Sequence, residues 1–289
     1  MKLDGRELAE KIYVHLKTRV RELQKKNVTP QLAVILVGKN PASLAYVIAK
    51  QKQGEKIGAT INIIQYPESV TSNVLIKKVT ELNADSTVHG ILIQRPLPDH
   101  IDSTQLEMLT NPEKDIDGFH PQSPYTLPLP LAVIEILGDI FLSKQPEKER
   151  GIRNPIQLLN WLSKNKIVIL GKGETGGKPI IAYFQRLGLM PQIVDSKTPN
   201  RQKILKQADI LISAVGKEQV ITPAMIKKEA ILIGVGMHKD PNGKLRGDYD
   251  EEAIKEKASF YTPTPGGVGP VNVAMLMDNL LTATEKQTA

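Results

Sequence analysis

The sequence predicts an α/β protein of two domains, each built around a parallel sheet. Three observations predict this class. The length of 289 residues suits two domains of ordinary size. Short apolar runs of strand length alternate with longer helix-like stretches, the order that gives parallel sheets with right-handed crossovers. A proline-rich stretch over residues 121–130 divides this alternation into two blocks. We therefore expect a first domain over residues 1–120, a second over 121–263, and a last segment, 264–289, whose helix packs back on the first domain.

The first block begins with a buried strand over residues 32–37 that ends at Gly38. Asn40 and Pro41 then open a helix, because asparagine is a good N-cap and proline is tolerated at the first helical position. This helix is expected to end near Gly58. Two more strands and one helix complete the block, the strands at 60–65 and 90–94 and the helix at 73–82.

The second block begins with an apolar strand that runs directly into a glycine-rich turn. The strand covers residues 166–170, and the helix after the turn is expected to end near residue 188. Three further strands are predicted at 192–194, 210–214 and 231–235. The last helix of the chain is expected to begin after Pro270, with Asn272 as its N-cap.

The composition is typical of a soluble protein and fits a reducing compartment, although many secreted proteins also lack cysteine. There is no cysteine, which excludes a disulfide scaffold, a thiolate nucleophile and a cysteine-ligated metal. The first residues lack the apolar core of a signal peptide. The most apolar helical segment, residues 129–142, contains Glu135 and Asp139, and no stretch reaches the roughly 20 apolar residues that span a bilayer. We expect a cytoplasmic protein without a membrane partner.

The net charge of +7 raises the question of nucleic-acid binding. Aromatic residues are scarce, however, and the lysines are scattered among acidic residues, so we predict no nucleic-acid partner. A basic surface also attracts small anions such as phosphates and glutamate tails. No histidine has a metal-ligand spacing to another histidine or a carboxylate, and we predict no metal. The histidines are His15, His89, His100, His120 and His238.

A dinucleotide-binding motif follows the first strand of the second block. Gly171, Gly173 and Gly176 form a G-x-G-x-x-G between a strand and a helix. Such glycines allow a tight turn and close backbone approach, and the helix N-terminus offers N–H groups to a pyrophosphate. Asp195 follows about 20 residues later at the end of the next strand, where a carboxylate accepts hydrogen bonds from an adenosine ribose. This pattern predicts a Rossmann-type domain; the alternative is a plain strand–helix turn with Asp195 as a local cap.

The choice between NAD and NADP is open at this point. Asp195 disfavours a ribose 2′-phosphate by repulsion, which indicates NAD. Lys172, Ser196 and Lys197 lie close in the sequence and are suited to bind that phosphate, which indicates NADP. Met237 is a further predicted cofactor contact.

Tyr46 and Lys50 lie four residues apart on the predicted helix of the first block, so their side chains share a face. A lysine transfers protons near neutral pH when burial lowers its pKa, and a neighbouring tyrosine offers a flat surface to an aromatic ligand. By themselves such residues are more often an amphipathic surface pair.

Four motifs, in order along the chain, change that assessment. They are Val37-Gly-Lys-Asn-Pro-Ala-Ser-Leu-Ala-Tyr-Val-Ile-Ala-Lys50, Gly90-Ile-Leu-Ile-Gln-Arg-Pro-Leu-Pro98, Pro112-Glu-Lys-Asp-Ile-Asp-Gly-Phe-His-Pro121 and Pro263-Thr-Pro-Gly-Gly-Val-Gly-Pro270. Together they resemble the methylenetetrahydrofolate dehydrogenase/cyclohydrolase family over almost the whole chain. The resemblance implies oxidation of 5,10-methylenetetrahydrofolate with NADP, and hydrolysis of the methenyl product to 10-formyltetrahydrofolate.

The resemblance also implies roles for single residues. Lys50 would transfer the proton in hydrolysis, Gln94 would hold Lys50, and Tyr46 would orient the folate. Asp117 would accept hydrogen bonds from the pterin, whose amino-pyrimidine edge presents N–H donors. The loop with Pro265, Gly266 and Gly267 would lie between substrate and nicotinamide. The expected ligands are tetrahydrofolate derivatives, including polyglutamylated ones, and a nicotinamide dinucleotide, and the expected assembly is a homodimer.

The sequence departs from the family pattern mainly at the nucleotide loop. Lys172 and Gly173 stand where the family usually has arginine and serine, which weakens the transfer of NADP and keeps NAD open. Gly234 replaces a usual acid, the segment 122–132 is altered, and the segment 145–160 is long. Two alternatives therefore remain: an NAD-dependent dehydrogenase with little or no cyclohydrolase activity, and a nucleotide- or folate-binding module without catalysis.

Overall fold

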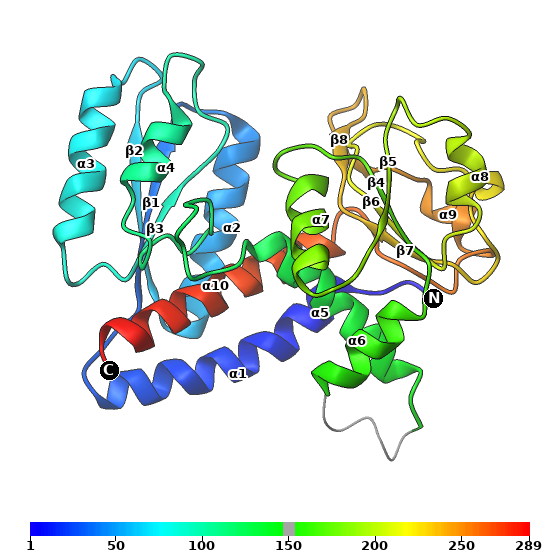
Figure 1. The fold of residues 1–289 in the computed structure, drawn as a ribbon. Coiled ribbons are helices and arrows are strands. Elements are labelled where there is room, and N and C mark those ends of the chain that lie inside the picture. Colours follow the sequence, from blue (N-terminus) through cyan, green and yellow to red (C-terminus); the bar gives the residue numbers. More distant parts are fainter. Residues whose placement is uncertain (147–153) are drawn as a thin grey trace. The chain divides into compact units, whose positions relative to one another are not determined.

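The computed structural model describes residues 1–146 and 154–289 (Figure 1). The chain divides into two compact units. The three-strand unit comprises residues 10–128 and 273–289, and the five-strand unit comprises residues 1–9 and 129–272. The divisions after residues 128 and 272 lie eight and nine residues beyond the predicted boundaries at 120 and 263. Residues 1–9, which the sequence placed in the first domain, belong to the five-strand unit instead.

Parallel pairing joins all the described strands of the three-strand unit, in the order β2–β1–β3. The strands are β1 (Gln31–Val37), β2 (Thr60–Tyr66) and β3 (Gly90–Ile93). Helices α2 (Pro41–Ile57) and α3 (Ser72–Ala84) connect them and cover opposite faces of the sheet (Figure 1). Because successive side chains of a strand point to opposite faces, every second residue of β1 packs toward α3. These residues are Ala33, Ile35 and Val37, which share a buried cluster with Leu75 and Val79.

Helix α2 has the ends that the sequence predicted. The Asn40 side chain accepts hydrogen bonds from the N–H groups of Ala42 and Ser43. Pro41 occupies the first turn, where no intrahelical N–H donor is needed. Gly58 ends the helix with a φ of 94°, a left-handed conformation that favours glycine. The helix therefore starts and stops at fixed positions, which sets the direction of the side chains along it.

Two long helices contribute to the three-strand unit although their first residues belong to the five-strand unit. They are α1 (Gly5–Lys25), a helix not predicted from the sequence, and α10 (Val268–Gln287). The last 17 residues of the chain, with most of α10, belong to the three-strand unit, as predicted for the returning segment. The predicted start of α10 is wrong. The helix begins at Val268, so Pro270 lies in its first turn and Asn272 is an interior residue, not the N-cap. Proline fits there because the first N–H groups of a helix have no intrahelical partner.

The sheet of the five-strand unit has the order β10–β7–β6–β4–β5 with parallel pairing throughout its described strands. These are β4 (Ile167–Leu170), β5 (Gln192–Val194), β6 (Ile210–Ser213), β7 (Ile231–Gly234) and β10 (Phe260–Tyr261). The chain leaves β4 on one side to form β5 and returns to its other side to form β6. The carboxyl ends of β4 and β6 therefore mark the switch point at which open α/β sheets bind ligands. The predicted α/β class with a Rossmann-type second domain is confirmed.

The remaining elements are short or lie outside the two sheets. They are α4 (Ser103–Leu109), α5 (Pro128–Ser143), α6 (Pro155–Ser163), α7 (Gly177–Arg186), α8 (Arg201–Leu205), the 3-10 turn Pro223–Met225, β8 (Met237–Lys239), β9 (Leu245–Gly247) and α9 (Glu251–Ile254). Part of the long segment 145–160 lies outside the described residues, and the rest contains the start of α6, capped by Asn154.

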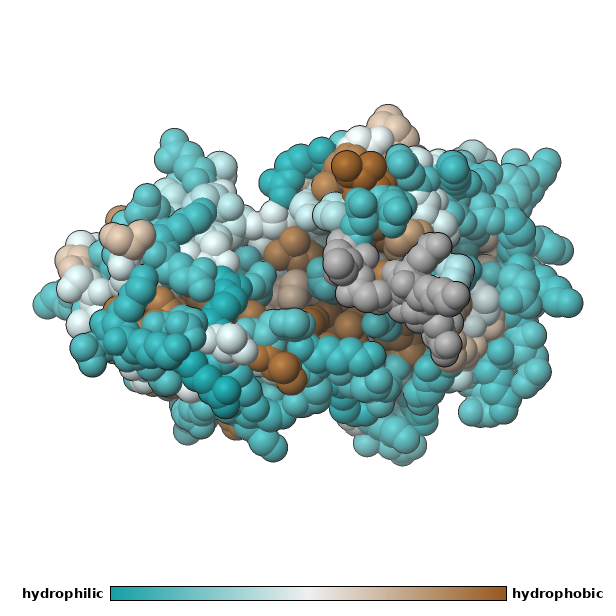
Figure 2. All heavy atoms as spheres, turned by 90° about the horizontal axis from the view of Figure 1, so that it is seen from below, coloured by the Kyte–Doolittle hydropathy of each residue, from teal (hydrophilic) through white to brown (hydrophobic). Residues whose placement is uncertain are grey.

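The described helices include none with the length and apolar character needed to span a membrane. On the face shown in Figure 2 hydrophilic residues predominate.

Candidate active site

Lys50 is the centre of the candidate site in the three-strand unit. It lies on the buried side of α2, with only 9% of its surface exposed. Its Nζ donates a hydrogen bond of 3.0 Å to the Oε1 of Gln94. Gln94 directly follows β3, and its backbone N–H extends the ladder by bonding to Ile35. Its side-chain amide also donates to the carbonyl of Arg95 at 2.7 Å, which fixes the Oε1 atom toward the lysine. The sheet and α2 thus hold the predicted pair together.

Burial of Lys50 favours an amine that exchanges its proton. Burial lowers the pKa of Lys50, and the nearby negative charge of Asp117 acts in the opposite direction. Burial raises the pKa of Asp117, while the charges of Lys50 and Arg95 lower it. Since the hydrogen-bond partner of Lys50 is a neutral amide, that bond can form with either the ammonium or the neutral amine. The pKa values of Lys50 and Asp117 therefore lie closer together than those of a free lysine and a free aspartate.

Lys114 and Asp115 hold the loop that carries Asp117. The buried ammonium of Lys114 donates to three carbonyls at the end of α3, those of Leu82, Asn83 and Asp85, at 2.7–3.0 Å. The Asp115 carboxylate accepts from the backbone N–H groups of His120 and Gly118. Burial raises the pKa of Asp115 to about 6. A backbone bond from Ile91 to the carbonyl of Lys114 attaches the loop to β3. The loop is therefore fixed on the same strand that leads to Gln94.

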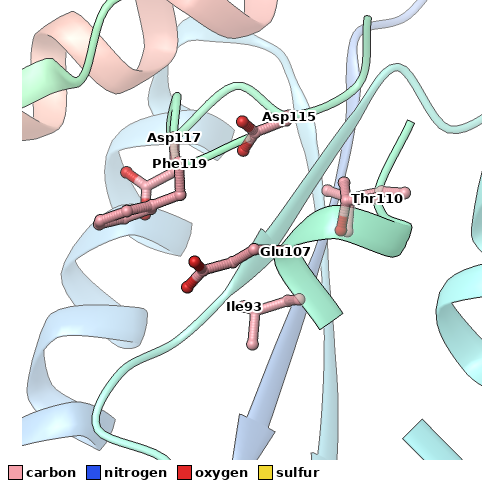
Figure 3. Close-up of a pocket in the computed structure, with 7 residues that line it drawn as sticks. Ile93, Glu107, Thr110, Asp115, Asp117 and Phe119 are labelled. Atoms are coloured by element: carbon pink, nitrogen blue, oxygen red, sulfur yellow. The ribbon is translucent and has the colours of Figure 1, made fainter. Parts of the chain in front are cut away.

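A small pocket lies beside this loop (Figure 3). Glu107, Asp115 and Asp117 contribute carboxylates to its wall, and the Phe119 ring lies next to Asp117 (Figure 3). Arg95 pairs with Glu107 and stacks its guanidinium on Phe119, 4.4 Å from the ring centroid. The volume of about 10 Å³ is enough for one water molecule, so this space does not hold a pterin ring. Within the described residues no group donates a hydrogen bond to Asp117, which leaves its oxygens available to a ligand.

The C-terminal helix supports the Asp117 loop from behind. Asn279 of α10 is buried, and its side-chain amide donates to the carbonyls of Ile116 and Thr126, both at 2.9 Å. Gln287, at the end of the same helix, donates to the carbonyls of His89 and Glu113. The returning segment thus ties together both ends of the loop and the start of β3.

The glycine-rich turn of the five-strand unit lies at the switch point of the sheet. Gly171 has a φ of 97°, and a Cβ there would lie 2.6 Å from the carbonyl oxygen of Ala214, in the loop after β6. A Cβ at Gly177 would lie 1.9 Å from the carbonyl oxygen of Gly171. Gly173, in contrast, faces open space, and a Cβ at Gly176 would make an ordinary contact. The N–H groups of Gly176 and Lys178 are already bonded to the carbonyl of Gly173.

Comparison with known proteins decides the family. The model of the tetrahydrofolate dehydrogenase/cyclohydrolase catalytic domain matches residues 3–117, and that of the tetrahydrofolate dehydrogenase/cyclohydrolase NAD(P)-binding domain matches residues 152–288. The bifunctional protein FolD of Ligilactobacillus salivarius is 39% identical over 99% of this chain and 98% of its own length. This chain belongs to the tetrahydrofolate dehydrogenase/cyclohydrolase family.

Solved structures agree with this assignment. The bifunctional FolD enzyme of Campylobacter jejuni superposes with a TM-score of 0.87 at 33% identity, covering 99% of each chain. The Trypanosoma brucei dehydrogenase-cyclohydrolase, solved with NADP and an inhibitor, superposes with a TM-score of 0.84 at 30% identity, covering 99% of this chain and 97% of its own.

Against this family background, the structure brings some of the predicted residues together and separates others. Lys50, Gln94 and Asp117 lie together in the three-strand unit, and Tyr46, 38% exposed, precedes Lys50 by one helical turn. Burial raises the pKa of Tyr46. The loop with Pro265, Gly266 and Gly267 belongs to the five-strand unit. A Cβ at Gly266 would lie 2.7 Å from the Arg6 guanidinium, so that arginine packs directly on the loop.

At the nucleotide end, Asp195 directly follows β5. Its Oδ2 pairs with the ammonium of Lys172 at 2.7 Å, and its Oδ1 accepts from the Lys197 N–H and the Thr198 hydroxyl. Chiefly because of the bond from Lys172, the pKa of Asp195 is lowered to about 2. Ser196 lies in the same turn, and Met237, 39% exposed, begins β8 with its backbone against Gly216.

Three residues that shape the candidate sites were not predicted from the sequence. Gly177, the neighbour of the predicted Gly176, allows the tight contact between turn and helix. Asp248 is fully buried, bonds to the hydroxyl of Ser213, and accepts N–H groups from Val215, Gly216 and Lys217. Asn279 is the third. The Gly176-Gly177 pair was visible in the sequence, whereas the partners of Asp248 and Asn279 are distant in the chain.

Proposed function

We propose that this chain catalyses both reactions of its family: oxidation of 5,10-methylenetetrahydrofolate to the methenyl form, and hydrolysis of the methenyl form to 10-formyltetrahydrofolate. The observation that carries this proposal is the buried Lys50 whose Nζ donates to Gln94 Oε1 at 3.0 Å. A buried amine with a lowered pKa has the property that hydrolysis needs, since it can take a proton near neutral pH and give it back.

Hydrolysis requires three proton movements. Water adds to the methenyl carbon and loses a proton, the bond from that carbon to the pterin nitrogen N5 then breaks as N5 gains a proton, and the hydroxyl on that carbon loses its remaining proton to solvent as the formyl C=O forms. Neutral Lys50 would take the proton from the attacking water, and the resulting ammonium would supply the proton to N5, so that the net reaction releases one proton. Gln94 would keep the amine aligned in both states because its Oε1 accepts from either form. Asp117, which has no protein donor among the described residues, would bind the N–H groups of the pterin, and Tyr46 would orient the ring.

Oxidation uses a nicotinamide ring as the hydride acceptor. The folate nitrogens push the hydride out, so we assign no side chain as its acid or base. The residues present at the switch point fit the dinucleotide, because the close contacts of Gly171 and Gly177 form a turn that only glycines allow. Gly173, Gly176, Lys172, Asp195, Ser196, Lys197 and Met237 would contact the cofactor, and Pro265–Gly267 the substrate.

We propose NADP as the principal cofactor, supported by the cluster of Lys172 and Lys197 beside Asp195. A dehydrogenase that uses NAD and does not hydrolyse is the second candidate, favoured by Asp195 itself. The homodimer, polyglutamylated substrates and the cytoplasmic location stay predictions from the sequence.

One pair of assays tests the function. Oxidation of methylenetetrahydrofolate is followed with NADP and with NAD separately, and hydrolysis of methenyltetrahydrofolate is followed in parallel without a nucleotide. We expect oxidation and hydrolysis in the same preparation. Oxidation without hydrolysis would favour the second candidate, and binding of folate and nucleotide without either reaction would overturn the enzyme assignment.

A further inference from the structure

The ion pair between Lys172 and Asp195 joins two positions that the sheet places side by side. Leu170 of β4 pairs with Val194 of β5, and the Gly171 N–H bonds to the Val194 carbonyl at 2.8 Å. Lys172 lies two residues after the carboxyl end of β4, and Asp195 lies one residue after the carboxyl end of β5. Both therefore stand at the end of the sheet where open α/β folds bind nucleotides.

The pair occupies only one oxygen of the carboxylate. Asp195 Oδ1 is held by the turn that follows it, through the Lys197 N–H at 2.9 Å and the Thr198 hydroxyl at 3.0 Å. Oδ2 is bound by Lys172 at 2.7 Å. The aspartate is thus fixed by its own turn, whereas its partner is a flexible side chain with 64% of its surface exposed. Exposed ion pairs are weak, so a ligand can displace the lysine without disturbing the aspartate.

The surroundings leave room for such a ligand. Apart from Gly173 itself and its two chain neighbours, no described residue has an atom within 4 Å of the place that a Cβ at Gly173 would take, so the rest of the protein leaves this turn open. An aspartate with a free oxygen accepts a ribose hydroxyl, and an unpaired aspartate repels a 2′-phosphate. An aspartate neutralised by a lysine does not repel it, and the lysine itself attracts it.

Resting on the proposed function, we propose that Lys172 and Asp195 act as one unit that sets cofactor specificity and lets the same site accept both NADP and NAD. With NADP, Lys172 stays beside Asp195, cancels its charge and contacts the 2′-phosphate. With NAD, Lys172 moves aside and Asp195 Oδ2 accepts a hydroxyl of the adenosine ribose.

Direct binding of two fragments tests this without relying on turnover. Adenosine 2′,5′-bisphosphate carries the 2′-phosphate, and ADP carries the free 2′-hydroxyl; both are titrated into the full chain by calorimetry. Lys172→Met should weaken the bisphosphate at least tenfold, because Asp195 then faces the phosphate unpaired, and should change ADP affinity less than threefold. Asp195→Asn should weaken ADP binding about threefold or more, and it should leave the affinity for the bisphosphate unchanged or higher.

The double variant shows whether the residues act together. In the Asp195→Asn background, Lys172→Met should still weaken bisphosphate binding, but by a factor less than half of the one it causes in the wild type. The reason is that no repelling charge remains at position 195. Lys203→Met, which removes one exposed positive charge from α8, is the matched control and should change neither affinity more than twofold. Added salt should weaken bisphosphate binding more steeply than ADP binding.

The results separate this proposal from the proposed function. Lys172→Met with bisphosphate affinity within twofold of the wild type, or equal effects of Lys172→Met in both backgrounds, would overturn the specificity unit even if the wild type oxidises folate. Conversely, the expected fragment affinities in a chain without folate chemistry would uphold the unit and reject the function. Methenyl hydrolysis, measured on every variant without nucleotide, reports whether the three-strand unit is intact.

Discussion

Replacing Asn279 with leucine tests whether the C-terminal helix positions the substrate loop. Leucine has the same branching and the same number of side-chain heavy atoms as asparagine but no donor, so Asn279→Leu removes the bonds to the carbonyls of Ile116 and Thr126, each 2.9 Å long, without opening a cavity. Leaving a buried carbonyl without its donor costs about 1–3 kcal/mol, so two of them should cost about 2–6 kcal/mol. For a unit of this size that corresponds to a loss of roughly 6–18 °C in Tm.

The functional effect should fall on substrate binding. Ile116 directly precedes Asp117, the residue whose carboxylate is proposed to bind the pterin. When the Ile116 carbonyl loses its hydrogen bond, the position of the Asp117 carboxylate is no longer fixed. The contact between Lys50 and Gln94 involves neither carbonyl. We therefore expect the KM for methenyltetrahydrofolate to rise about tenfold while kcat falls less than threefold.

The assay combines calorimetric unfolding with steady-state hydrolysis. Thr284→Val is the matched control, because Thr284 is fully buried in the same helix and, among the described residues, its side-chain hydroxyl donates within that helix, to the Leu280 carbonyl. This control should keep the wild-type KM. If Asn279→Leu unfolds within 2 °C of the wild type and keeps its KM, the helix does not hold the loop and the reasoning fails.

Three further predictions concern single residues. Lys50→Met should abolish methenyl hydrolysis while calorimetry shows a folded protein; hydrolysis at the wild-type rate would reject the proton-transfer role. Asp115→Asn should flatten the dependence of the free energy of unfolding on pH. The pKa of Asp115 is raised from 3.8 to about 6, so this residue stabilises the fold below pH 4. About 3 kcal/mol of that stabilisation is lost as the pH rises through 6. Unfolding curves from pH 4 to 7 that run parallel for both proteins would contradict this. Gly177→Ala should weaken NADP binding more than tenfold in a fluorescence titration, because a Cβ would lie 1.9 Å from the Gly171 carbonyl oxygen; Gly173→Ala, in open space, should weaken it far less, and equal losses would count against the packing argument.

Local signals explain which elements were predictable. The N-cap Asn40, the following proline and the terminal Gly58 specify helix α2 within a few residues of each end, and the apolar strands followed from their composition. Helix α1 carried the same kind of signal, since Leu16, Val20 and Leu23 are buried at helical spacing, but it was not anticipated. The start of α10 was misplaced because a proline can lie inside the first turn as well as before it.

Long-range partners explain what no local pattern contains. Asn279 bonds to a carbonyl 163 positions away, and Asp248 to a hydroxyl 35 positions away. The residue type does not indicate such a partner, because in the sequence a buried asparagine or aspartate cannot be distinguished from one on the surface. Lys50 and Gln94 were found only through the family motif; the i, i+4 spacing of Tyr46 and Lys50 alone favoured a surface pair.

The opposed pKa shifts of Lys50 and Asp117 couple substrate binding to the strength of the base. Pterin N–H donors would stabilise the charged form of Asp117, and a charged Asp117 raises the pKa of Lys50. Binding would therefore make Lys50 a better proton acceptor at the moment when water must lose its proton. Asp117→Asn removes this charge, so the pKa of Lys50 should fall and the rising limb of kcat for hydrolysis should move to lower pH. A limb that stays in place in this variant, measured at saturating substrate, would show that Lys50 does not respond to Asp117.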